Sequence, residues 1–103
     1  MSVIVIATAF PIPEYRDEVI AAFETAIAQV HDQEPDVEVY ALHEGTDRLV
    51  MIEKYASEQA RAEHVKGMAL ATLVSALDGK LSSKLEVQVL QPHPAGDTRK
   101  GAL

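Results

Sequence analysis

Three residues in the second half of the chain carry side chains suited to acid–base chemistry: Glu53, Tyr55 and His64. A neutral imidazole can take a proton from a phenol or an activated carbon acid near pH 7, so His64 is the candidate base. Glu53 and Tyr55 fall on one face of a strand, where they could orient an imidazole or a substrate hydroxyl. Each residue could instead have a structural role. His64 could be a hydrogen-bonded core histidine, Glu53 could form a strand-end salt bridge with Lys or Arg, and Tyr55 could serve packing alone.

An apolar wall beside these groups is suggested by helical spacing. Ala60, His64 and Met68 would share one face of a continuous helix, where the small Ala60 leaves room beside the imidazole. Phe23, Met68 and Leu70 are the candidate apolar walls, on the same ground of helical facing. The sequence therefore predicts a pocket that combines one base with apolar surroundings.

We predict neither a metal nor a cofactor. The histidines at 31, 43, 64 and 93 match no short metal-ligand spacing, and the chain has no cysteine. His31 falls at the end of a predicted helix, where a cation favours the negative end of the helix dipole. No GxGxxG or P-loop pattern is present to hold a nucleotide phosphate, and no serine lies in a GxSxG turn.

Length and charge narrow the class of protein. The chain has 103 residues, which suits one domain, and 48% of them are hydrophobic. The net charge of −7 would repel a phosphate backbone, so nucleic acid is not an expected partner. The apolar run near the N-terminus is far shorter than the ~18 residues that cross a bilayer, so we expect a strand in a cytoplasmic protein and no membrane partner.

The elements that must position the candidate residues alternate between strands and helices. Proline and glycine positions and hydrophobic periodicity predict strands at 3–9, 37–43, 48–55 and 85–90, a helix at 13–31, and a helix from 58 to about 78 that is broken at Gly67. We assign residues 1–92 to one domain. Residues 93–103 form a polar C-terminal tail without periodicity, which is either disordered or an arm over a partner.

The order βαββαβ predicts an α+β, ferredoxin-like fold with both helices on one face of an antiparallel sheet. The first and third strands carry apolar residues on both faces, for example Val5 against Ile6 and Met51 against Ile52. Because the helices cover only one face, we expect a second copy of the chain to cover the other, giving a homodimer through the sheet faces.

Several of these residues also resemble a known family. The chain is similar to the antibiotic biosynthesis monooxygenase superfamily, and to its quinol monooxygenase-like members, in Glu34-Pro35, Tyr40, Glu53, Tyr55 and His64. The resemblance covers about residues 3 to 92 and implies a dimeric α/β barrel. It also implies a cofactor-independent monooxygenase that oxidises a quinol or polycyclic phenol with dioxygen, with His64 as the base.

The chain departs from that family at several positions. Asp36 stands where members often have Gly, and Ala69 and Leu70 stand where many have His and Phe. The chain contains no Asn and no Trp, so the catalytic sets of the polyketide-oxidising and haem-degrading branches do not carry over. Two alternatives therefore stay open: a non-catalytic binding or stress-response module for a small molecule, and an isomerase or decarboxylase that uses His64 on a carbonyl compound.

Overall fold

The strands form one antiparallel sheet in a computed structural model that describes residues 1–103. The strands are β1 (Val3–Ala9), β2 (Val37–Glu44), β3 (Leu49–Tyr55) and β4 (Glu86–Leu90). Their order across the sheet is β2-β3-β1-β4, so β1 pairs with β3 on one side and with β4 on the other. This arrangement confirms the predicted ferredoxin-like α+β fold.

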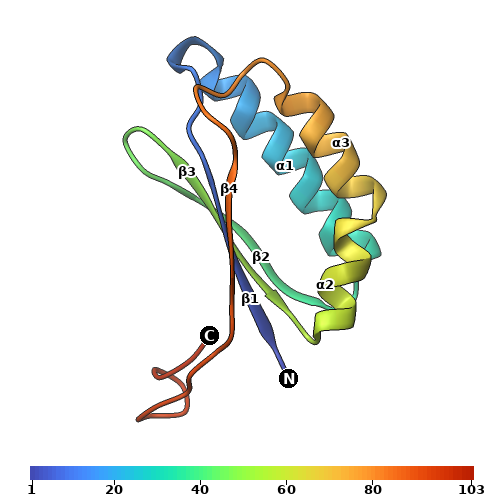
Figure 1. Ribbon diagram of the computed structural model, residues 1–103, viewed down its shortest axis with the longest axis vertical. Coiled ribbons are helices and arrows are strands. Elements are labelled where there is room, and N and C mark those ends of the chain that lie inside the picture. Colours follow the sequence, from blue (N-terminus) through green and yellow to red (C-terminus); the bar gives the residue numbers. More distant parts are fainter.

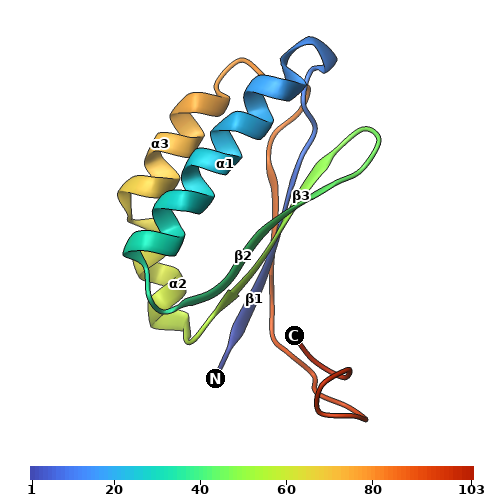
Figure 2. The ribbon, with the colours of Figure 1, turned by 180° about the vertical axis from the view of Figure 1, so that it is seen from behind.

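The helices all lie on one face of this sheet (Figures 1 and 2). They are the short 3-10 helix η1 (Pro13–Tyr15), α1 (Arg16–Gln33), α2 (Glu58–Val65) and α3 (Met68–Leu77). In both views α1 and α3 run side by side, and α2 covers the end of the sheet where β3 finishes. No helix is long and apolar enough to cross a membrane.

Helix α1 packs on the sheet through one apolar stripe. Its buried residues, spaced four, three and four apart, are Val19, Phe23, Ala26 and Val30. This spacing places them on a single face, because residues three and four apart are neighbours on a helix. With Leu49 and Met51 of β3 and Leu73 of α3, they belong to the main hydrophobic core.

The predicted break in the second helical segment is confirmed at Lys66 and Gly67. Helix α2 begins at Ser57, whose hydroxyl oxygen accepts a hydrogen bond from the Ala60 amide at 3.1 Å. It ends where the Gly67 amide donates to the carbonyl of His64 at 3.0 Å. A Cβ at Gly67 would lie 3.2 Å from that same carbonyl oxygen, so a glycine suits this close turn.

The opposite face of the sheet carries apolar side chains that no helix covers. On β1 and β3 this face includes Ile6, Val50 and Ile52, all partly buried. The C-terminal segment, which has no helix or strand after Leu90, returns to this face, where Lys54 donates to the backbone oxygen of Leu103 at 2.7 Å.

Candidate functional site

His64 projects from α2 into the interior, and only 4% of it is exposed. It lies four residues after Ala60, so both residues fall on the one buried face of this short helix. The serine cap fixes where the helix starts and the turn at Gly67 fixes where it ends. The imidazole is therefore carried by a helix whose two ends are both defined by local sequence.

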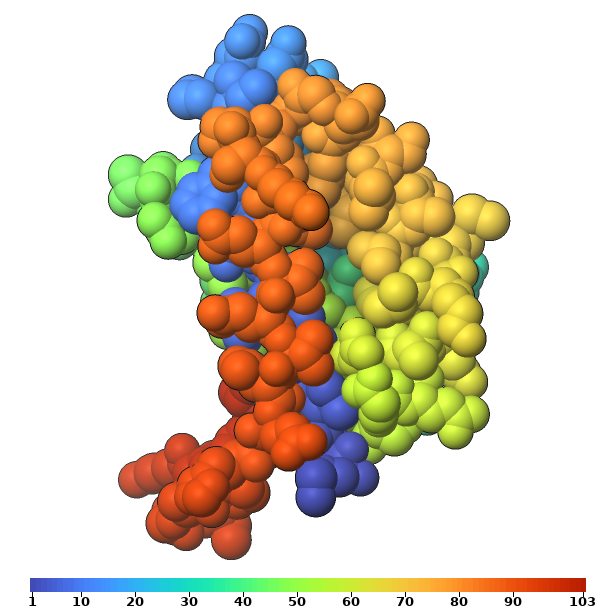
Figure 3. All heavy atoms as spheres, in the orientation of Figure 1, coloured from blue at the N-terminus to red at the C-terminus, as the bar shows by residue number.

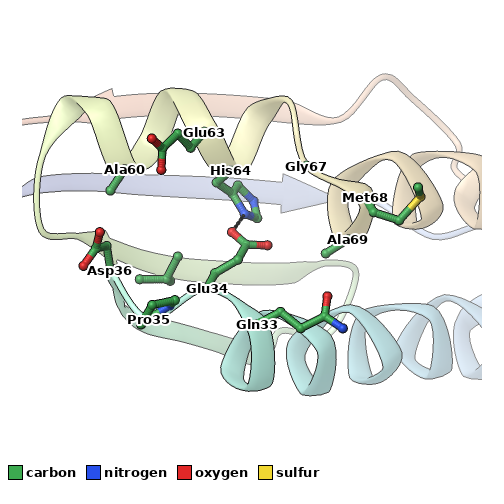
Figure 4. A pocket seen from close by; sticks show the side chains of 11 residues that line it. Gln33, Glu34, Pro35, Asp36, Ala60, Glu63, His64, Gly67, Met68 and Ala69 are labelled. Carbon is green, nitrogen blue, oxygen red and sulfur yellow. Dashed lines mark hydrogen bonds and ion pairs between the residues drawn. The ribbon is translucent and has the colours of Figure 1, made fainter.

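A carboxylate from the end of α1 holds one nitrogen of this imidazole. Glu34 follows the last residue of α1, and its Oε1 lies 2.7 Å from Nδ1 of His64 (Figure 4). A carboxylate only accepts hydrogen bonds, so Nδ1 carries the hydrogen and Nε2 is the basic nitrogen of the neutral ring. Nε2 has no hydrogen-bond partner in the chain. Every fully buried side-chain nitrogen or oxygen has one, so Nε2 is not fully buried and can be reached by another molecule.

Glu53 and Tyr55 lie on the helix-facing side of β3 and contact each other. The Tyr55 hydroxyl donates to Oε1 of Glu53 at 2.5 Å, and 6% of Glu53 is exposed. Burial raises the pKa of the Glu53 carboxyl, an effect that the hydrogen bond from Tyr55 and the nearby His64 oppose in part. The expected salt bridge of Glu53 with Lys or Arg is wrong, because the strand pleat turns the adjacent Lys54 to the opposite face.

Two tyrosines flank the imidazole. The ring centroids of Tyr40 and His64 are 5.2 Å apart at 64°, and those of Tyr55 and His64 are 5.4 Å apart at 49°. Burial, and then the charge of Glu53, raises the pKa of both tyrosines, which therefore remain neutral phenols at neutral pH. The Tyr40 hydroxyl has no hydrogen-bond partner in the chain, is not fully buried, and belongs to a residue that lines the same cavity as His64.

An apolar cavity of about 80 Å³ lies between the sheet and the helices. Fourteen residues line it and 11 of them are hydrophobic. The predicted site residues that it brings together are His64, Glu53, Tyr55, Phe23 and Leu70. The cavity reaches the surface between α2 and β4, where Val65 and Val87 are about half exposed, and Figure 3 shows this furrow beside the orange strand.

Met68 is not part of this cavity, so the prediction that it forms an apolar wall there is wrong. Its side chain is 71% exposed and lines a neighbouring cleft instead. The shared face predicted for His64 and Met68 needs a continuous helix, and the break at Gly67 interrupts it.

That neighbouring cleft, of about 230 Å³, lies on the other side of the imidazole (Figure 4). It is lined by 11 residues, of which four are hydrophobic and three carry carboxylates: Glu34, Asp36 and Glu63. His64 is the one residue that lines both the cleft and the apolar cavity. No group of three or more His, Cys, Asp or Glu side chains is placed to hold a metal ion.

His31 remains in the last turn of α1, as its predicted capping role requires. Its Nε2 also lies 3.0 Å from the carbonyl oxygen of Tyr40, so it ties the helix end to β2. The partnership of Glu34 with His64 was not predicted from the sequence. The two residues are 30 positions apart, and they meet only because the fold brings the end of α1 close to α2.

The arrangement can remove a proton from a molecule held against Nε2. Glu34 orients the imidazole, the two tyrosines pack against its ring, and the apolar lining limits access of water. The unpartnered Tyr40 hydroxyl can donate a hydrogen bond to an oxygen of the same molecule.

Comparison with known proteins agrees with this architecture. The model of the antibiotic biosynthesis monooxygenase family matches residues 2–75, which include Glu34, Glu53, Tyr55 and His64. No curated protein matches the chain.

Several solved structures have folds closely similar to that of this chain. Rv0793 from Mycobacterium tuberculosis is 26% identical, with a TM-score of 0.86 over 94% of this chain and 100% of that one. A protein from Caulobacter crescentus assigned as an antibiotic biosynthesis monooxygenase is 23% identical, with a TM-score of 0.82 over 86% of this chain and 87% of that one. A conserved protein from Methanosarcina mazei is 17% identical, with a TM-score of 0.81 over 88% and 92%. The last two likenesses support the fold alone. With the family model matching most of its length, this chain belongs to the antibiotic biosynthesis monooxygenase family.

Proposed function

We propose that this protein is a cofactor-independent monooxygenase that oxidises a small electron-rich aromatic, such as a quinol, with dioxygen. The observation that carries the proposal is the state of His64. Its Nδ1 is held by Glu34, its basic Nε2 has no partner in the chain, and the imidazole lines an apolar cavity. Membership of the monooxygenase family supports the same reaction class.

In the proposed reaction the substrate itself supplies the electrons. Nε2 of His64 takes the proton of a phenolic hydroxyl, and the phenolate passes one electron to dioxygen. The resulting radical pair combines to form a bond between a ring carbon and oxygen. The ring carbon then loses its hydrogen as a proton, the O–O bond breaks, and water leaves with the proton returned by His64. One quinol and one dioxygen thus give one hydroxyquinone and one water.

The size of the cavity favours a single ring over a polycyclic phenol. A closed cavity of about 150 Å³ holds benzene, whereas this cavity measures about 80 Å³. A one-ring substrate would therefore fill the cavity and extend into its mouth between Val65 and Val87.

Oxygen uptake with hydroquinone tests the proposal, with His64→Gln as the decisive variant. Glutamine keeps most of the side-chain volume but cannot cycle a proton near neutral pH, so we expect a loss of about 100-fold or more. His43→Gln is the matched control, because His43 is exposed on β2 and lies outside the cavity. Wild-type oxygen uptake by His64→Gln would show that His64 is not the base.

Isomerisation of a carbonyl compound is a second candidate, favoured by one observation. The Glu53 carboxyl, whose pKa is raised by burial, lines the same cavity as His64, so a carboxyl group and an imidazole border one cavity, as proton shuttling between two carbon atoms requires. Product formation in the strict absence of oxygen would support this activity over the monooxygenase.

We also propose that the protein is a homodimer in which two sheets pack face to face. The partly buried Ile6, Val50 and Ile52 on the helix-free face support a second copy of the chain as the covering partner.

A further inference from the structure

One permanent cation lies among the apolar residues at the cavity. Arg61 is on α2, three residues before His64, and it lines the cavity together with Val65 and Val87 at the mouth. Its side chain is 26% exposed, which fits an arginine whose stem packs on the cavity rim while its guanidinium head reaches water. None of the other lining residues is a lysine or arginine.

The guanidinium of Arg61 has N–H groups that make no hydrogen bond within the chain. Its Nε lies 3.0 and 3.1 Å from the two carboxylate oxygens of Glu58, and one Nη nitrogen reaches the same carboxylate at 2.5 Å. The other Nη nitrogen makes no hydrogen bond in the chain. Glu58 is 62% exposed, and ion pairs this open to water contribute little and exchange readily. An incoming anion can therefore share or replace Glu58.

The rest of the molecule does not attract anions. The net charge is −7, and the cleft on the far side of His64 is lined by the carboxylates of Glu34, Asp36 and Glu63. A negatively charged ligand is attracted to this protein only where a positively charged donor can contact it. Along the cavity that donor is Arg61. A planar guanidinium suits a carboxylate because it can offer two parallel N–H groups.

We propose that the cavity takes an aromatic acid, with the ring inside and its carboxylate at Arg61 in the mouth. The inference deepens the proposed function, because it names a phenol that carries a carboxylate as the substrate class. Only the phenolic hydroxyl of this substrate class rests on the proposed function. The contact between the carboxylate and Arg61 concerns binding and does not depend on the reaction.

Two probes that differ by a single group test the proposal: hydroquinone and 2,5-dihydroxybenzoate, which is the same ring with a carboxylate. Their affinities are measured by calorimetric titration without oxygen, so that no turnover interferes. We expect the acid to bind wild-type protein about tenfold more tightly or better, because a charged hydrogen bond is added. Arg61→Gln should abolish that preference, so that the two probes bind the variant with similar affinities.

Two further variants separate a local contact from a general effect of charge. Glu58→Gln removes the competing carboxylate, so we expect it to strengthen binding of the acid and not of hydroquinone. Arg48→Gln is the control, because it removes the same charge from another arginine–carboxylate pair, with Asp47 at 2.8 Å, outside the cavity. We expect it to leave both affinities unchanged.

The proposal is overturned if the acid binds wild-type protein no better than hydroquinone, if neither probe binds at millimolar concentration, or if Arg61→Gln keeps the preference. Oxygen uptake separates its failure from that of the proposed function. Uptake with hydroquinone that depends on His64, without a preference for the acid, refutes this inference alone. An Arg61-dependent preference without any oxygen uptake supports it and refutes the monooxygenase.

Discussion

Replacing Tyr55 with phenylalanine removes one hydroxyl from the most buried polar contact of the site. That hydroxyl donates to Glu53 at 2.5 Å, and no other side chain donates to this carboxyl group. A hydrogen bond to an ionised group contributes about 1.5–3 kcal/mol to the free energy of unfolding. We expect Tyr55→Phe to lose about that amount near pH 8, which corresponds to a fall in Tm of at least about 6 °C for a domain of this size.

The free energy of unfolding that Tyr55→Phe loses should depend on pH in a defined direction. Burial raises the pKa of Glu53 above its unfolded value, so its contribution to stability is fully present below the ordinary carboxyl range and is lost as pH rises through the folded pKa. The Tyr55 hydroxyl lowers that pKa and so limits the loss. Without it, stability should fall more steeply with pH, and the deficit of Tyr55→Phe should be smaller near pH 4 than near pH 8.

Urea denaturation followed by circular dichroism, at one protein concentration, measures both effects. Tyr40→Phe is the matched control, because Tyr40 is equally buried on the same side of the sheet but its hydroxyl has no partner in the chain. We expect the control to change the free energy of unfolding by less than about 0.5 kcal/mol. Equal losses in the two variants, or a larger deficit of Tyr55→Phe at acid pH, would refute the role given to the Glu53 contact.

Three other changes test separate parts of the molecule. Ile6→Asp places a carboxylate on the helix-free face of the sheet, and we expect it to shift sedimentation from dimer to monomer; a stable wild-type monomer at micromolar concentration would contradict the dimer. Truncation after Gln91 removes the partner of Lys54, and we expect a Tm a few degrees lower, whereas an unchanged Tm would mean that the tail contributes nothing. Glu34→Gln loses the charged acceptor of the His64 Nδ1 hydrogen, and we expect oxygen uptake to fall about tenfold or more while the fold is kept; full activity would show that the imidazole needs no orienting group.

The features that could be predicted from the sequence are those that short stretches of chain determine. Pro11 and Pro13 end the first strand, Ser57 caps α2, and Gly67 breaks the second helical segment, because each acts on its immediate neighbours. The alternation along β3 also placed Glu53 and Tyr55 on one face, as the structure has them.

The features that could not be predicted depend on how distant elements meet. Glu34 reaches His64 only because the end of α1 lies beside α2, and nothing in the spacing of the two residues indicates this. The partner of Glu53 is the hydroxyl of Tyr55, and no lysine or arginine forms a salt bridge with it, because the one arginine at the cavity, Arg61, pairs with Glu58. The position of Met68 follows from the phase of α3 after the break, which the presence of a glycine does not specify.

His64 borders both the apolar cavity and the polar cleft, so the proposed reaction would have separate routes for its substrate and for proton exchange. A substrate would enter the apolar cavity between α2 and β4, whereas Glu34, which lines the polar cleft, holds Nδ1 of the same ring. An imidazole can gain a proton on one nitrogen and release another from the second, so charge can cross it while the ring stays in place. Glu34 is 22% exposed and can pass that proton to water. A proton held on the imidazole, after its removal from the substrate and before its return to the leaving water, can therefore exchange with solvent through Glu34 and not through the mouth of the cavity.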